Sequence, residues 1–237
     1  MATINFTLPT IEEAIRDVCN TLEERPAVSW RNHSEDELWR ELVSCILGSR
    51  VRIKAVNAAI ERMNSMCLLT RPQPRSCFNQ LEEDTLAALA GGYPFFRVRA
   101  NQIRRAAEHI YISRGSILSL LNDLDDVSIA RRLLVREVPG LGPKQASLFL
   151  RNICFAKYIA ILDVHILAYL HWVGITDSSL KSISNLRKYE ALEGAFIEQA
   201  CAFGYSPDQF DLAVWIVIRV AKEESKLADR ASRIGWT

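Results

Sequence analysis

The sequence predicts an all-α fold, and three observations support this prediction. Apolar residues recur at the three- and four-residue spacing of a helix face through most of the 237 residues. Capping signals stand just before several of these apolar segments. The chain shows neither a hairpin signal nor an alternation of strand and helix patterns, so no sheet is expected.

In the first third of the chain, capping signals mark where helices should begin. Thr10 with Glu13 is read as one capping box, and Ser34 with Glu37 as another. Helical spacing then covers residues 11–22, 38–46 and 53–63. The prolines of "TRPQPRS" break any helix and predict a loop after residue 67.

The rest of the chain also reads as helices. Helical spacing is expected over residues 82–90, 98–112, 117–121, 128–137, 143–153, 164–170, 189–201 and 207–220. Ser206 offers a cap with Pro207 as the first helical residue and Gln209 as its reciprocal partner. Lys157–Leu162 could be extended, and a loop or a buried turn fits it equally well.

The amino-acid composition and net charge limit the kinds of molecule that the protein is expected to bind. The chain is 49% hydrophobic and 24% charged, with a net charge of +1, so the molecule as a whole is not a polycation. If the protein binds nucleic acid, local clusters of cationic side chains must provide the contacts. The alternative is that these clusters are only solvated helix faces. The clusters are Arg50, Arg52 and Lys54; Arg97, Arg99, Arg104 and Arg105; and Arg131, Arg132 and Arg136.

Cysteine and histidine usage predicts an intracellular protein without a zinc site. The six cysteines include no C-x-x-C pair, and the four histidines show no paired spacing. The start "MATINFTLPT" lacks the pattern of a signal peptide, and no uncharged apolar stretch reaches membrane-spanning length. We therefore expect a cytoplasmic protein.

The stretch "EVPGLGPKQASLFLRN" (137–152) places two glycines and two prolines between apolar helical segments. Gly140 and Gly142 permit positive φ and close backbone approach, and Pro143 suits the first position of a helix. Amides exposed in such a turn can hold a phosphate, so the pattern indicates a helix-hairpin-helix that grips a DNA backbone. An ordinary turn between two helices is the alternative.

Lys144 and Asp163 add chemistry that a backbone grip does not need. Lys144 falls in the first turn of a helix, where the positive dipole end disfavours a second cation and favours a neutral, nucleophilic amine. It could instead pair with a phosphate or face solvent. Asp163 precedes the apolar helix "VHILAYL" and could cap it, or stabilise positive charge on a sugar and assist proton transfer. His165 is read as packing or helix surface.

The stretch at 137–152, followed downstream by "AILDVHIL", resembles the helix-hairpin-helix DNA glycosylases, and most closely their type-two 8-oxoguanine DNA glycosylase/AP lyase branch. The residues that fit are Gly140, Gly142, Lys144, Ala146, Ser147, Phe149, Leu150, Arg151, Asn152, Asp163 and His165. Val164 departs, because an arginine is usual there. The resemblance implies that Lys144 is the nucleophile that forms a Schiff base and that Asp163 is its catalytic partner.

Further stretches extend the resemblance over most of residues 38–220. "ELVSCILGSRVRIKAVNAAIERM" is similar to the early helix pair of the superfamily, where Arg50 or Ser49 would enter the gap that the flipped base leaves. Asp211 and Trp215 share one helical face and would read and stack on that base, although a core tryptophan and a surface aspartate fit the pattern equally.

The resemblance also implies an architecture and a set of ligands. It implies one glycosylase domain of two helical lobes with the active site in the cleft between them. We expect one lobe at about 35–125, the hairpin and catalytic segment at about 126–170, and residues 1–34 and 171–237 packing together as the other lobe. Gly140, Gly142 and Gln145 would bind the DNA backbone, with a monovalent cation at the carbonyls of Val138 and Gly140. Only Cys201 lies late in the chain, so no iron–sulfur cluster or other cofactor is expected.

The predicted function is therefore excision of a damaged base, 8-oxoguanine first, from double-stranded DNA by a monomeric glycosylase/AP lyase. The tail "KEESKLADRASRIGWT" differs from the compact, lysine-containing end of the branch. A glycosylase for another modified base, including one that defends against foreign DNA, is thus an alternative. The others are a non-catalytic DNA-binding protein that kept the hairpin and a helical scaffold.

Overall fold

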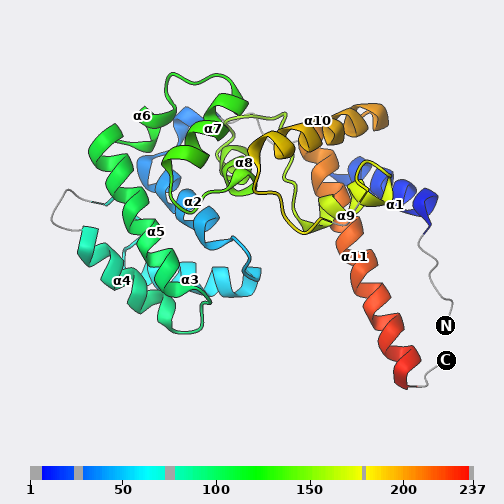
Figure 1. Cartoon of the computed structure of the whole chain (residues 1–237), viewed down its shortest axis with the longest axis horizontal. Helices are drawn as coiled ribbons and strands as arrows, with labels where there is room; N and C mark the ends of the chain where they lie inside the picture. Colours follow the sequence, from blue (N-terminus) through cyan, green and yellow to red (C-terminus); the bar gives the residue numbers. More distant parts are fainter. Residues whose placement is uncertain (1–6, 24–28, 73–77, 178–179, 235–237) are drawn as a thin grey trace. The chain divides into compact units, whose positions relative to one another are not determined.

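The computed structural model of the chain describes residues 7–23, 29–72, 78–177 and 180–234, with side chains described as far as residue 225. Within these residues the structure consists of helices and connecting loops and contains no strand (Figure 1). The all-α prediction is confirmed, and residues 157–162 form a non-helical connection.

The chain divides into two compact units. Residues 27–156 form one continuous piece, called here the central unit. Residues 1–26 and 157–237 form the other, the terminal unit, which therefore uses both ends of the chain. The segment expected to form the hairpin and catalytic region, 126–170, is shared: its first part belongs to the central unit and residues 157–170 belong to the terminal unit.

In its described residues, the central unit consists of seven α-helices and two shorter helical turns. In chain order these are a 3-10 turn at Trp30–Asn32, α2 (Glu35–Leu47), α3 (Ile53–Ser65), α4 (Phe78–Ala90), α5 (Phe96–Glu108), a π-helical turn at His109–Arg114, α6 (Ile117–Leu121), α7 (Val127–Glu137) and α8 (Pro143–Asn152). Helix α2 packs against α3, α5, α6 and α8, so it lies at the centre of this unit. Seven of its thirteen residues are buried, Trp39 among them.

Helix α2 begins where its sequence predicts. The Ser34 amide donates to Glu37 Oε2 at 2.7 Å, and the Glu37 amide donates to Ser34 Oγ at 3.3 Å. This reciprocal pair satisfies two of the amides that a helix start leaves without a partner. Hydrogen bonds from Ser34 lower the pKa of the Glu37 carboxyl. The second predicted capping box is therefore confirmed.

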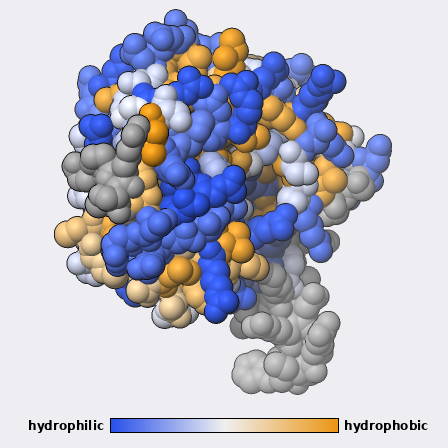
Figure 2. All heavy atoms as spheres, turned by 60° about the vertical axis from the view of Figure 1, so that its left-hand side comes forward, coloured by the Kyte–Doolittle hydropathy of each residue, from blue (hydrophilic) through white to orange (hydrophobic). Residues whose placement is uncertain are grey.

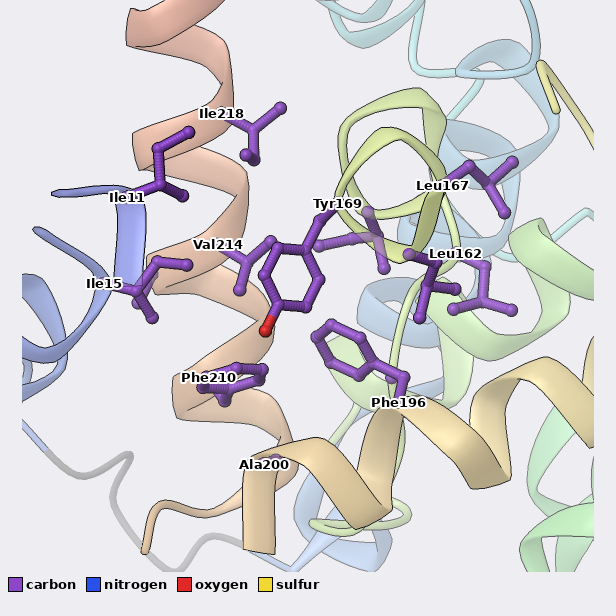
Figure 3. Packing of buried hydrophobic residues seen from close by; sticks show 14 of the residues in the cluster. Ile11, Ile15, Leu162, Leu167, Tyr169, Phe196, Ala200, Phe210, Val214 and Ile218 are labelled. Atoms are coloured by element: carbon purple, nitrogen blue, oxygen red, sulfur yellow. The ribbon is translucent and has the colours of Figure 1, made fainter. Parts of the chain in front are cut away.

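The part of the terminal unit that the structure describes contains four α-helices: α1 (Leu8–Thr21), α9 (Val164–Trp172), α10 (Leu186–Phe203) and α11 (Pro207–Ile234). Helix α11 contacts the other three. Figure 3 shows the ring of Tyr169 among Phe196, Phe210 and Val214 in the core that these helices share. Tyr169 meets Phe196 and Phe210 edge-on, with ring centroids 6.2 and 5.9 Å apart, an arrangement that aromatic quadrupoles favour.

Two predicted caps in this unit were partly wrong. Helix α1 begins at Leu8 rather than after Thr10, because the Thr7 amide donates to Thr10 Oγ1 at 3.0 Å and Thr7 takes the capping position. Pro207 is the first residue of α11 as expected, but Gln209 does not reach back to Ser206. The side-chain Nε2 of Gln209 donates instead to the backbone carbonyl of Cys19 at 2.8 Å, and this bond links α11 to α1.

Exposed apolar side chains of the central unit stand beside cations. Ile53 is 67% exposed between Arg52 and Lys54, and Phe95 and Val98 are more than half exposed near Arg97. On the face drawn in Figure 2, hydrophobic side chains are likewise interspersed with hydrophilic ones.

None of the described helices combines the length and apolar character needed to cross a membrane.

Candidate functional site

The motif at 137–152 folds as a helix-hairpin-helix in the central unit. Helix α7 ends at Glu137, the turn follows, and α8 begins at Pro143 with Gly142 as its N-cap residue. The Leu141 amide donates to the Val138 carbonyl at 3.2 Å and closes the turn. Helices α7 and α8 pack directly on each other, so the predicted hairpin is present.

The two glycines of the hairpin meet different surroundings. Gly140 has a φ of +96°, and a Cβ there would stand 3.0 Å from Ile46 Cγ2 and 3.1 Å from Gln102 Oε1. Gly142 has a φ of −95°, and a Cβ there would meet nothing within 4 Å. Gly140 is therefore required by the fold. Gly142 leaves open space in which another backbone could approach the α8 N-terminus.

Lys144 is half-buried in the first turn of α8, beside helix α2. Its positive charge acts on the Cys45 thiol of α2, which also interacts with Glu41. Burial raises the pKa of the Cys45 thiol well above its usual value, the Glu41 carboxylate adds to that rise, and the positive charge of Lys144 opposes it. The thiol donates to Glu41 Oε1 at 3.3 Å, and Asn152 donates to the same oxygen at 2.8 Å.

Gln145, expected at the DNA backbone, has its side chain directed into the protein. It is 3% exposed, and its Nε2 donates to the carbonyl of Cys45 near the end of α2. Because the last carbonyls of a helix lack partners of their own, this bond fastens α8 to α2. The side chain thus holds the hairpin in place, and the amides of the α8 N-terminus are what this end of the helix can offer to a phosphate.

The turn that contains Ser49 and Arg50 is linked to the hairpin through α5. Arg99 donates to the Ser49 carbonyl at 2.9 Å and to Gln102 Oε1 at 2.7 Å, and Gln102 lies against Gly140. Arg50 is exposed and has a φ of 63°, a conformation that costs energy for a residue with a Cβ. The central unit therefore brings these two predicted DNA contacts into one network.

Glu137, the last residue of α7, is held by two arginines and a histidine. Its carboxylate accepts from Arg114 at 2.7 Å, from Arg136 at 2.8 Å and from His109 at 3.1 Å. Burial alone would raise its pKa, but these hydrogen bonds outweigh burial and lower the pKa to about 2. The network joins the π-helical turn to the residue that enters the hairpin.

Asp163 lies in the terminal unit, where it is the N-cap of α9. Its Oδ1 accepts from the amides of His165 and Ile166 at 2.7 and 3.1 Å. Its Oδ2 accepts from the indole Nε1 of Trp215 on α11 at 3.0 Å. The capping role predicted for this residue is therefore present, and a third bond from a separate helix accompanies it.

The segment that leads to Asp163 is held by side chains in place of a neighbouring strand. The amides of residues 160, 161 and 162 donate at 3.1, 3.4 and 3.1 Å to three buried side chains. In order, these acceptors are Glu193, Asp211 and the Tyr189 hydroxyl. Because buried amides without partners are costly, this arrangement fixes the path of the backbone just before the carboxylate.

Asp211 and Trp215, expected around a flipped base, make these internal contacts from one face of α11. Asp211 is 3% exposed, whereas Trp215 is half-buried and meets the ring of His165 edge-on at 5.9 Å. Tyr189 and Glu193 on α10 were not singled out from the sequence. Polar residues four apart on an amphipathic helix look like a solvent-facing stripe, so no local signal marks them as buried.

Comparison with known proteins gives a consistent family. The model of the family described as 8-oxoguanine DNA glycosylase matches residues 20–205. A curated 8-oxoguanine DNA glycosylase/AP lyase of Korarchaeum cryptofilum is 32% identical over 197 residues, which cover 83% of this chain and 87% of that protein.

Solved structures give the same result. The crystal structure of Methanocaldococcus jannaschii 8-oxoguanine DNA glycosylase aligns with a TM-score of 0.64 at 28% identity, covering 87% of this chain and 91% of that one. The same archaeal enzyme in complex with a 15mer DNA containing 8-oxoguanine aligns with a TM-score of 0.62 at 25% identity, covering 87% and 88%.

Proposed function

Because the chain belongs to the 8-oxoguanine DNA glycosylase family, we propose that it excises 8-oxoguanine from double-stranded DNA and cleaves the resulting abasic site, with Lys144 as nucleophile. The observation that carries this proposal is the position of Lys144. The residue lies half-buried in the first turn of α8, directly after the hairpin whose open N-terminus suits a phosphate. A DNA-binding module alone has no use for a partly buried lysine there.

The target nucleotide has to leave the base stack before its sugar can react. The Nζ lone pair of Lys144 then attacks C1′, the bond between C1′ and the base breaks, and the base departs with the electron pair and takes up a proton. The attached nitrogen loses a proton, the bond between C1′ and O4′ breaks, and O4′ is protonated as the ring opens to an iminium that links Lys144 to C1′. Removal of a C2′ proton then expels the 3′ phosphate with the electron pair of the C3′–O bond and cleaves the strand.

Asp163 has the complementary role in this proposal. Positive charge develops at C1′ both as the base leaves and in the iminium, and a fixed carboxylate stabilises such charge. Three N–H donors occupy its two oxygens, and a carboxylate offers about four acceptor sites, so it keeps capacity to accept a proton.

For binding, we propose that the α8 N-terminus and the amides of Gly140 and Gly142 take one phosphate. Carbonyl oxygens suit a monovalent cation, and the Val138 carbonyl keeps a free lone pair after accepting the Leu141 amide. With the Gly140 carbonyl it would hold such an ion against the phosphate. Arg50 or Ser49 would enter the gap in the duplex, and Asp211 and Trp215 would lie near the base.

Trapping with borohydride tests this proposal, because hydride reduces the iminium to a stable amine. Wild-type protein is expected to form a covalent adduct with a duplex that contains 8-oxoguanine. Lys144→Gln is expected to form none while keeping its salt-dependent affinity for DNA. An adduct of undiminished yield with this variant would contradict the assignment. Asp163→Asn is expected to lose turnover and keep DNA affinity, whereas loss of folding would leave only the capping role.

A panel of duplexes, each with one modified base, decides the substrate. Val164 is 48% exposed at the start of α9, at the position where the family resemblance implies an arginine, and this favours testing other bases as a second candidate. We propose a monomer that acts on cellular DNA in the cytoplasm. Light scattering with and without a bound duplex would measure the stoichiometry.

A further inference from the structure

We propose that Trp215 is a positioning residue that acts on the reaction through Asp163, and that its indole N–H is the group that matters. The inference rests on the proposed function, because it assigns Asp163 to the reacting sugar. It differs from the expectation that Trp215 stacks on the base. The contact that carries it is the 3.0 Å hydrogen bond from Trp215 Nε1 to Asp163 Oδ2.

Capping alone does not fix a carboxylate. The two amides of α9 both donate to Oδ1, so the cap restrains one oxygen and gives Oδ2 no donor. The Cβ–Cγ torsion has broad minima, so the position of Oδ2 is then defined only loosely. The indole N–H of α11 binds Oδ2 and restrains the second oxygen as well. Trp215 therefore selects the direction in which the remaining acceptor sites of Asp163 point.

The indole is itself held in one orientation. Arg219, one turn further along α11, places its guanidinium over the Trp215 ring, 4.9 Å from the centroid. The imidazole of His165 meets the ring edge-on at 78°. A cation over the face and a ring against the edge define the plane of the indole and hence the direction of its N–H.

The backbone on the other side of Asp163 is equally constrained. The buried side chains of Tyr189, Glu193 and Asp211 bind the three preceding amides, so the chain enters Asp163 along a fixed path. Asp211 and Trp215 stand one turn apart on α11. One face of this helix thus sets both the approach to the carboxylate and its rotation, which is the arrangement that a fixed catalytic group requires.

The decisive experiment compares two substrates with Trp215→Phe, which keeps most of the ring and removes the N–H. One duplex carries 8-oxoguanine, and the other carries a preformed abasic site. Single-turnover excision is measured on the first and borohydride trapping on the second. A hydrogen bond to a charged group corresponds to about 10- to 100-fold in rate. We expect a loss of this size on both duplexes, with DNA affinity unchanged, because the positive charge at C1′ forms in both reactions.

The abasic duplex separates the two roles of Trp215. If the ring acts by stacking on the base, Trp215→Phe slows excision but leaves the abasic reaction at the wild-type rate, and the proposal is overturned. Wild-type rates on both duplexes overturn it as well. If wild-type protein itself forms no adduct on either duplex, the proposed function fails, and this inference falls with it.

Two comparisons exclude a folding effect. Trp172→Phe changes a 42% exposed indole at the opposite end of α9 and should leave both rates unchanged. In the Asp163→Asn background, Trp215→Phe should cause no further loss, because the group through which it acts is already altered. A general folding defect would lower the rate in both backgrounds and would count against the proposal.

Discussion

Replacing Gly140 with alanine tests whether the hairpin glycines have separate roles. The residue has a φ of +96°, a region in which a side chain is strained. Its new Cβ would also stand 3.0 Å from Ile46 Cγ2 and 3.1 Å from Gln102 Oε1. Gly142→Ala is the matched control, because Gly142 lies two residues away in the same turn at a φ of −95° with open space around it.

The expected magnitude follows from three contributions. A left-handed backbone with a Cβ costs about 1–2 kcal/mol. Crowding in a packed interior adds about 1–3 kcal/mol, since Ile46 is β-branched and Gln102 must give up its bond with Arg99 to move. The reduced entropy of the unfolded alanine chain returns about 0.4–1 kcal/mol. Gly140→Ala should therefore lower the free energy of unfolding by about 1–5 kcal/mol, and Gly142→Ala should change it by less than about 0.5 kcal/mol.

Urea denaturation followed by tryptophan fluorescence measures this difference, because buried Trp39 reports on the central unit. Affinity for a short duplex completes the comparison. Gly142→Ala should unfold at the wild-type urea concentration and bind DNA more weakly, because its Cβ fills the space left for a phosphate. The reasoning is refuted if Gly140→Ala is as stable as wild type, or if both variants lose the same stability.

Three further outcomes are expected. Hydrogen bonds lower the pKa of the Glu137 carboxyl from 4.5 to about 2. The stabilisation that the carboxylate provides is therefore complete above about pH 4.5 and is lost as the pH falls toward 2. Glu137→Gln should remove this part of the acid dependence of the thermal midpoint. Gln145→Leu should lower the free energy of unfolding by about 1–3 kcal/mol by leaving the Cys45 carbonyl without its partner, and an unchanged urea midpoint with weaker DNA binding would instead assign Gln145 to DNA. Tyr169→Phe should keep or raise the thermal midpoint, because the buried Tyr169 hydroxyl has no hydrogen-bond partner in the described part of the chain; a clear fall would contradict this.

Local patterns predicted the parts of the site that are local in the chain. Gly142 and Pro143 begin α8 as their backbone preferences require, and this places Lys144 in its first turn. Asp163 caps α9 because a short acceptor stands just before an apolar helix. Such features depend on a few neighbouring residues and can be read without a fold.

Contacts between distant residues could not be predicted in this way. Trp215 and Asp163 are 52 positions apart, and Gln145 and Cys45 are 100 apart. Both pairs depend on which helix faces meet. The same limit explains the misplaced start of α1, where Thr7 and Thr10 both fit a cap and only the observed bond decides. Helical periodicity predicted that Asp211 and Trp215 share one helix face. It could not predict which groups they contact, because tertiary packing decides what lies opposite that face.

The division of the chain sets an order for assembly during synthesis. The central unit is continuous from residue 27 to 156, so all of its helices are available before the second part of the terminal unit has been made. Helix α1 is made before the central unit but packs against α11, which is made after it. We expect the hairpin and its lysine to be in place on the ribosome while the aspartate still lacks its tryptophan partner. A nascent chain would thus hold DNA-binding structure before it acquires the geometry for strand cleavage.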